Sequence, residues 1–205
     1  MIVERVWNIF ANSLTKSQLR LLLMAQNKQK LTSFHELFHH NENKSETVKY
    51  FISLLTQTLG HDDQMRIFMQ IEEKTMGTAF HFVSMLSTRE VVELILKIPS
   101  KEKLKEILLY KDRYFGNILM NSVHNPDDQV FPWLYNLYEN HFVTKEEMKK
   151  FIFDEKNFIN ESLMFDLFSS GSLPILEFFW NEIIKIRLSF DLQEQSDILQ
   201  IKGFN

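Results

Sequence analysis

The sequence contains no cysteine, which excludes a disulfide framework and every metal site built from thiolates. The absence of cysteine fits a reducing compartment, so we expect an intracellular protein of the cytoplasm or nucleus. No apolar run reaches the length that a bilayer requires, and the N-terminal stretch MIVERVWNIF carries Glu4 and Arg5 among its apolar residues. We therefore expect no membrane partner for these residues.

The sequence also lacks a concentrated basic segment. Its 23 lysines and arginines and 27 aspartates and glutamates give a formal net charge of −4, and both signs are spread along the chain. A protein that binds nucleic acid normally presents a clustered basic face, because it must neutralise several phosphates at once. The charge pattern therefore predicts no nucleic-acid partner.

Glycine and proline are scarce, with five and four copies in 205 residues, and β-branched runs are rare. Apolar residues instead recur with the period of a helix, as in VVELILKI, KEKLKEILL and ILEFFWNEIIKI. Capping-box patterns at Thr15, Ser87 and Thr144 indicate helix starts, and the stretch Asn125-Pro126-Asp127-Asp128 indicates another. The sequence predicts an all-α protein.

Residues 35–39 read HELFH, which matches the zinc-peptidase pattern H-E-x-x-H. On a helix, His35 and His39 would lie on one face and could bind one Zn²⁺. Glu36 would then act as general base for the metal-bound water. This pattern gives the alternative function, a zinc-dependent hydrolase.

A repeat explains these histidines in another way. Four segments align at spacings of 46, 39 and 44 residues: LTSFHELF from Leu31, GTAFHFVS from Gly77, GNILMNSV from Gly116 and NESLMFDL from Asn160. A short amphipathic helix precedes each segment and a longer apolar helix follows it. Units of this size cannot close a core alone and must stack on their neighbours. We predict one α-solenoid domain over 1–205, with a partial repeat at 1–30 and four repeats at 31–76, 77–115, 116–159 and 160–205.

In this alignment His35 shares its position with His81, Met120 and Met164. The other three segments have no H-E-x-x-H pattern. A zinc site also needs a third protein ligand, and the extended peptidase motif would require glycine at 42 and histidine at 45, where the chain has Glu42 and Ser45. We therefore expect no metal and no cofactor.

The repeat resembles the ankyrin family. TSFH (32–35) and TAFH (78–81) are similar to the T-P-L-H that opens the first ankyrin helix, YKDRYFGN (110–117) to the preceding β-turn finger, and REVVELILKI (89–98) to the second helix. The resemblance covers the whole chain at the level of the repeat. It implies a structural role for Thr32, His35, Thr78 and His81, in which the threonine and histidine connect the turn to the helix start by hydrogen bonds. Helical pairs of the HEAT type, whose period is near 40 to 47 residues, remain the structural alternative.

The resemblance implies a non-catalytic scaffold that binds another protein through the concave surface of the solenoid, formed by the fingers and the exposed side of the first helices. On that surface we expect the partner-binding residues to be Glu36, His39, His40, Lys111, Asp112, Arg113 and Tyr114.

The two ends of the chain lack the polar outer face of a capping repeat. VERVWNIF at the start resembles a second helix, and SDILQIKGFN at the end resembles a short helix that leads into a finger. We therefore expect a segment of a longer array, with self-association through the uncapped ends as a further expectation.

Overall fold

The computed structural model describes residues 2–39, 45–72, 77–114, 116–141, 144–153 and 162–187. The prediction of an all-α fold is confirmed. Within these ranges no strand forms, and Gln26 and Thr32 make one isolated antiparallel bridge at the base of a loop. No helix in the described ranges is long and apolar enough to cross a membrane.

The helices fall into three groups that recur in the same order along the chain. The first helices, which follow a loop, are α3 (Ser33–His39), α6 (Ala79–Leu86), α9 (Ile118–Ser122) and α12 (Leu163–Ser170). The second helices are α1 (Ile2–Ser13), α4 (Ser45–Thr58), α7 (Arg89–Leu96), α10 (Val130–His141) and α13 (Leu173–Phe178), which continues as the π-helix η1 (Phe179–Arg187). The third helices are α2 (Lys16–Met24), α5 (His61–Phe68), α8 (Lys101–Leu109) and α11 (Lys145–Phe153).

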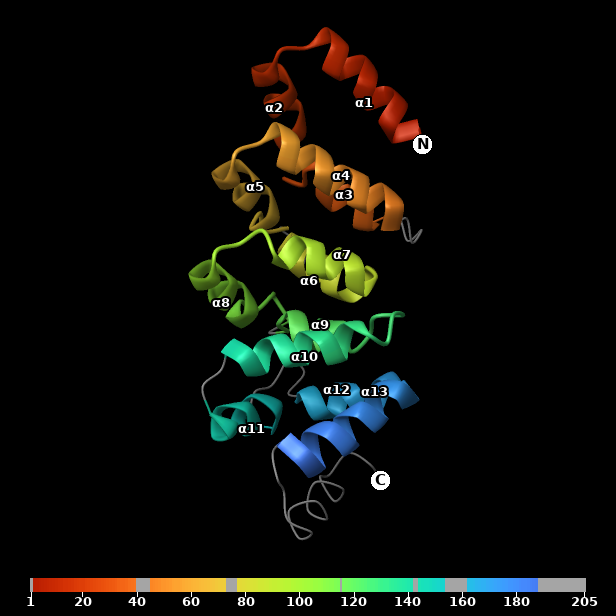
Figure 1. Cartoon of the computed structure of the whole chain (residues 1–205), viewed down its shortest axis with the longest axis vertical. Helices are drawn as coiled ribbons and strands as arrows, with labels where there is room; N and C mark the ends of the chain where they lie inside the picture. Colours follow the sequence, from red (N-terminus) through yellow and green to blue (C-terminus); the bar gives the residue numbers. More distant parts are fainter. Residues whose placement is uncertain are drawn as a thin grey trace.

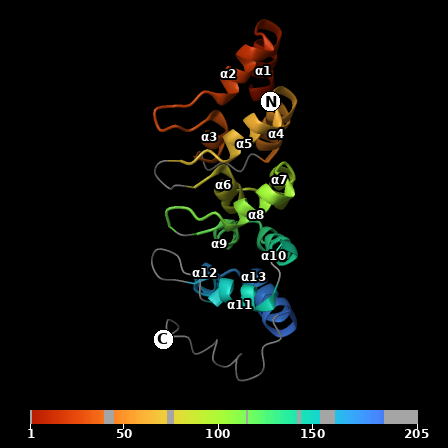
Figure 2. The same cartoon turned by 90° about the vertical axis from the view of Figure 1, so that its left-hand side faces the viewer.

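These groups stack as layers along one axis, from the red N-terminal end to the blue C-terminal end (Figure 1). We use "layer" for one first helix with the second and third helices that follow it. Equivalent helices contact each other between layers: α3 packs on α6 and α6 on α9, while α4 packs on α7, α7 on α10 and α10 on α13. The loops that lead into α3 and α9 project on the same side of the stack (Figure 2).

One hydrophobic core runs through all layers. Phe34 of α3 is fully buried and its ring lies 5.2 Å, centroid to centroid, from Phe68 of α5. Phe68 in turn lies 5.9 Å from Phe80 of α6, the equivalent of Phe34 in the next layer. A third helix therefore carries aromatic packing from one layer to the next. Trp133 and Trp180 are partly buried against this core.

The helix-start predictions are partly confirmed. Thr15 forms a capping box with Gln18, and Thr144 and Glu147 exchange two hydrogen bonds of 3.1 Å in the same manner. The prediction at Ser87 is wrong, because Ser87 ends α6 and Thr88 is the N-cap of α7.

One further helix-start prediction is corrected, and one helix starts later than its equivalents. Residues Asn125–Asp128 form turns before α10, which begins only at Val130, so Pro126 is not in a first helical turn. The N-cap of α12 is Ser162, whereas Thr32, Thr78 and Asn117 precede the other first helices. Helix α12 therefore begins one residue later within its segment than the other first helices do.

The ring of Phe34 provides a test of this core. Phe34→Ala removes contacts with three other aromatic rings and leaves a cavity, so we expect the free energy of unfolding to fall by about 3–5 kcal/mol. Urea denaturation followed by circular dichroism measures the change. Leu94→Ala is the control, because Leu94 is partly exposed on α7 and its replacement should cost less than about 0.5 kcal/mol.

Candidate functional site

The loops that lead into α3 and α9 have the same hydrogen-bond pattern. In the loop before α3, the backbone N–H of Asn27 donates to the carbonyl of Leu31 at 2.9 Å. The side-chain oxygen of Asn27 accepts from the N–H groups of Gln29 and Leu31. In the other, the N–H of Asp112 donates to the carbonyl of Gly116, also at 2.9 Å, and its carboxylate accepts from the N–H groups two and four residues later. An Asn or Asp side chain thus satisfies the polar backbone of each loop.

The loop before α6 shares the central bond of this pattern. The N–H of Glu72 donates to the carbonyl of Gly77 at 3.0 Å, and Glu72 is buried. Residues 73–76 lie outside the described residues. We refer to the loops 27–31, 72–77 and 112–116 together as the turn loops.

Gly116 closes its turn loop at a point where a side chain does not fit. A Cβ there would lie 2.8 Å from the side-chain oxygen of Asn121. Asn121 belongs to α9, and its amide lies 3.4 Å from the second carboxylate oxygen of Asp112. The glycine therefore lets the turn loop pack closely on the helix that follows.

A threonine–histidine pair joins two of the turn loops to their helices. The hydroxyl of Thr32 lies 2.9 Å from Nδ1 of His35, and Nε2 of His35 lies 3.2 Å from the carbonyl of Gln70 at the start of the next turn loop. In the next layer, Thr78 contacts Nδ1 of His81 with both its hydroxyl and its backbone N–H, at 3.0 and 3.2 Å. These are the local hydrogen bonds that the ankyrin resemblance implied.

His81 is buried in a way that disfavours its charge. Because the N–H of Thr78 donates to Nδ1, the proton of the neutral ring lies on Nε2, an atom with no hydrogen-bond partner in the described part of the chain. Burial lowers the pKa of His81, and the Asp112 carboxylate and the backbone of Tyr110 and Gly116 oppose this shift only in part. The imidazole is therefore held neutral.

The predicted partner-binding residues separate into two places. Lys111, Arg113 and Tyr114 are exposed on the turn loop before α9, while the carboxylate of Asp112 is engaged inside that loop. Glu36 is half-buried on α3 and accepts a hydrogen bond from the side chain of Asn27 in the first turn loop. The side chain of His39 and all of His40 lie outside the described residues.

The H-E-x-x-H pattern meets a geometric obstacle at its first residue. His35 is fully buried, and its two ring nitrogens bond Thr32 and the carbonyl of Gln70. A zinc ion could bind His35 only if one of these bonds broke. Among the described residues no group of three potential ligands (histidine, aspartate or glutamate) is positioned to hold a metal ion.

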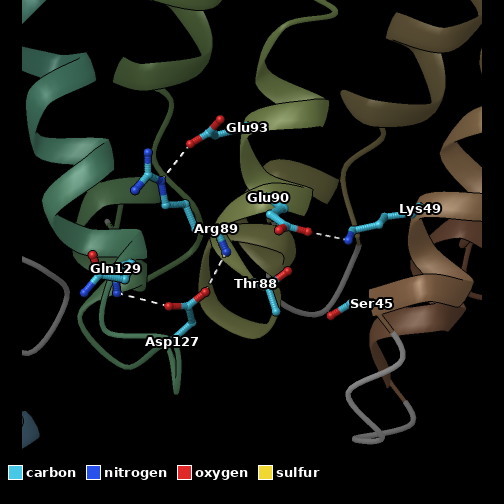
Figure 3. A pocket seen from close by; sticks show the side chains of 8 residues that line it. All are labelled: Ser45, Lys49, Thr88, Arg89, Glu90, Glu93, Asp127 and Gln129. Atoms are coloured by element: carbon cyan, nitrogen blue, oxygen red, sulfur yellow. Dashed lines mark hydrogen bonds and ion pairs between the residues drawn. The ribbon is translucent and has the colours of Figure 1, made fainter.

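A polar groove of about 550 Å³ lies on another part of the stack, where three layers meet near the N-termini of α4 and α7 (Figure 3). Its charged groups form ion pairs both between layers and within α7. Lys49 of α4 forms an ion pair with Glu90 of α7, which lowers the pKa of Glu90. Arg89 pairs with Glu93 on the same helix at 2.7 Å.

The groove also holds a helix cap that the sequence did not reveal. A carboxylate oxygen of Asp127 accepts from the backbone N–H of Arg89 at 2.8 Å, and the other accepts from the N–H of Gln129 (Figure 3). Asp127 belongs to the layer after α7, so one layer caps the helix of another. The neighbouring Asn125 also bonds the preceding layer. Its side-chain amide donates to the carbonyls of Ser84 and Ser87 at 2.8 Å each.

Comparison with known proteins supports the fold alone. No family model matches the chain, and no curated protein matches it. A chain in the crystal structure of the yeast ribosomal protein Rps3 in complex with its chaperone Yar1 is similar, with a TM-score of 0.50 and 15% sequence identity. The likeness covers 82% of this chain and 95% of that chain.

The burial of His81 predicts a pH dependence. The unfolded chain takes up a proton at this histidine below its ordinary pKa of about 6.5, whereas the folded chain resists it, so stability is full above that pH and is lost as the pH falls below it. Between pH 7 and 5.5 we expect this histidine to contribute a loss of about 1 kcal/mol in the free energy of unfolding.

His81→Met removes the titrating group and introduces the residue that the next layer has at Met120. The loss of stability between the two pH values, measured by urea denaturation, should be smaller in the variant by that amount. Equal losses in the variant and the natural protein would contradict the assignment.

The cap from Asp127 gives a second prediction. Asp127→Ala leaves the N–H of Arg89 without its acceptor, and the free energy of unfolding should fall by about 0.5–2 kcal/mol. Asp128→Ala is the matched control. The Asp128 carboxylate accepts a hydrogen bond from the side chain of the next residue, Gln129, and in the described part of the chain it caps no helix of another layer. A similar cost for both variants in thermal or urea unfolding would argue against a cap between layers.

Proposed function

We propose that the chain is a non-catalytic scaffold, built from degenerate ankyrin-like repeats, that binds another protein through the turn loops and the adjoining side of the first helices. The observation that carries this proposal is the shared hydrogen-bond pattern of the turn loops at Asn27 and Asp112. Because the side chains of Asn27 and Asp112 bond the backbone of their own loops, the shape of these two loops has internal support. Preformed loops bind with a smaller loss of conformational entropy than loops that must order on contact.

The tips of these loops expose side chains suited to recognition. Lys28 lies exposed on the first turn loop, and Lys111, Arg113 and Tyr114 lie exposed on the turn loop before α9. Both loops are on the same side of the stack (Figure 2). Tyrosine and arginine are the residue types that most often dominate the binding energy of protein interfaces.

The charge of this surface suggests the chemistry of the partner. The chain as a whole has a net charge of −4, yet the exposed charged residues that the structure describes at the loops before α3 and α9 are basic: Lys28, Lys30, Lys111 and Arg113. Two acids of these loops are withdrawn, because Glu72 is buried and the carboxylate of Asp112 is engaged by N–H groups, while Glu73 lies outside the described residues. A partner segment with carboxylate side chains would complement this surface.

The structural comparison is compatible with this proposal. The similar solved chain comes from a complex between two proteins, a ribosomal protein and its chaperone. At 15% identity this likeness supports a fold that takes part in protein complexes, and it names no partner for this chain.

Site-specific photocrosslinking tests the proposal. A photoreactive phenylalanine analogue at Tyr114 should capture a protein from cells that express the chain, whereas the same analogue at Leu94, on the second helix α7, should not. Reversing the charge of Lys111 and Arg113 should reduce the capture at Tyr114 without changing the melting temperature. Equal capture at both positions, or capture that survives charge reversal, would contradict the proposed surface.

A further inference from the structure

The residues at the two ends of the turn loop before α9 cover a buried histidine of the preceding layer. His81 of α6 is 3% exposed, and the ring of Tyr110 packs edge-on against its imidazole, with the ring centroids 5.7 Å apart. The backbone groups of Tyr110 and Gly116 also act on this imidazole. The position of the loop therefore decides whether water reaches the ring of His81.

Asp112 connects the same imidazole to the shape of the loop. One of its carboxylate oxygens accepts from the N–H groups of Tyr114 and Gly116, at 2.8 and 3.0 Å. Burial lowers the pKa of His81, and this carboxylate opposes that shift. The group that holds the turn is therefore also the anion that favours a proton on His81.

His35, the equivalent residue one layer earlier, has a complete set of bonds. Its ring nitrogens lie within hydrogen-bond distance of the Thr32 hydroxyl and the carbonyl of Gln70. In contrast, Nε2 of His81 has no hydrogen-bond partner among the described residues. A buried donor without an acceptor is unfavourable. Of the two histidines, His81 is therefore the one with a bond to gain when its surroundings open.

The ionisable groups on the other elements packed against α6 are engaged or lie nearer the surface. Helix α9 has none. On α3, Glu36 accepts from Asn27, and the side chain of His39 lies outside the described residues. Glu72 is buried in the loop before α6, whereas the ionisable residues of α5 are exposed or half-buried: His61, Asp62, Asp63 and Arg66. Those of α7 form the ion pairs of the polar groove. In the described part of the chain, Asp112 is the charged group that acts on His81.

A proton on Nδ1 of His81 does not fit the closed arrangement. Nδ1 accepts from the N–H of Thr78 at 3.2 Å, and a protonated ring has no lone pair left for that bond. The closed loop also keeps water from the charge. A conformation in which water reaches the ring binds the proton more tightly, so a fall in pH favours that conformation.

We propose that protonation of His81 opens the turn loop before α9: Tyr110 moves off the imidazole, Asp112 turns toward the cation, and the N–H groups of Tyr114 and Gly116 lose their acceptor. The loop opens before the helices unfold, because residues 111–114 are exposed or half-buried, whereas α6 and α9 pack on each other in the core.

The opening would change the surface that carries Lys111 and Arg113. Acid would replace a fixed arrangement of these side chains with a mobile one and so weaken the binding of a partner. This consequence rests on the proposed function, whereas the opening itself needs no partner. Photocrosslinking at Tyr114 could fail while the loop still opens in acid, so the two proposals are tested separately.

Backbone ¹⁵N relaxation of the intact chain tests the opening. Between about pH 7 and pH 5, the order parameters of Tyr114 and Gly116 should fall from about 0.85, typical of rigid backbone, to below about 0.6. Gln29 and Leu31 are the internal control and should stay rigid, because their acceptor is the neutral side chain of Asn27. Order parameters of Tyr114 and Gly116 that stay constant would overturn the proposal. Helix content, followed by circular dichroism, should also stay constant, and its loss in step with the loop would show global unfolding instead.

Variants identify the group that titrates. His81→Met introduces the residue that the next layer has at Met120 and should keep the loop rigid at the lower pH. His124→Ala, at an exposed histidine, should leave the transition unchanged. A transition that persists in His81→Met would assign the opening to another group and overturn the proposal.

Asp112→Asn provides a second test, which holds even if His81→Met does not fold. The new amide oxygen can accept from the loop N–H groups as Asn27 does, but the anion that favours the proton on His81 is gone. The transition should therefore move to lower pH. A transition at the same or a higher pH, or its loss in this variant while His81→Met retains it, would contradict the role of His81.

Discussion

The structure depends on the burial of apolar side chains between layers, since no layer encloses a core of its own. Phe34, Phe68 and Phe80 show the principle: a ring from a first helix packs on a third helix, which packs on the first helix of the next layer. Stability in such an architecture comes from nearest-neighbour interfaces, and each layer is stable only in contact with another. In the sequence, this arrangement corresponds to few glycines and to apolar residues that recur with the period of a helix.

Polar contacts also join neighbouring layers. His35 bonds the carbonyl of Gln70 at the next turn loop, and Asn125 bonds the carbonyls of Ser84 and Ser87 in the preceding layer. The hydroxyl of Tyr138 donates to the carbonyl of Leu108. Each of these contacts gives a partner to a backbone carbonyl near the C-terminal end of a helix, where the helix itself leaves carbonyls unbonded. Polar contacts and apolar packing therefore join the same neighbouring layers.

The sequence predicted the features that arise from local physics. Helical period identified the helices, and the T-x-x-H stretches marked the positions where Thr32 bonds His35 and Thr78 bonds His81. The sequence also predicted that the side chains of Lys111, Arg113 and Tyr114 are exposed, because they lie in a polar loop between periodic segments. The matching turn at Asn27 was not predicted, although asparagine is a turn signal.

The remaining errors have a common physical cause. Ser87 has the pattern of a cap, yet the N-terminus of α7 is served by Asp127, 38 residues away in sequence. Asp127 and Asn125 have the composition of a helix start, but their side chains bond the preceding layer and the helix begins only at Val130. A local sequence pattern does not show a contact whose partner lies about 40 residues away. The roles of Asp127 and Asn125 therefore could not be predicted before the packing of the layers was known.

The cap from Asp127 has a consequence for exchanging or shortening repeats. The predicted repeat boundary falls at Gly116, whereas the polar contacts that complete the N-terminus of α7 extend to Gln129. A chain cut at the sequence boundary would keep every residue of α7 and still lose the acceptor at its N-terminus. Chimeric arrays made from this protein should therefore be joined beyond Gln129, so that Asp127 remains with the helix that it caps.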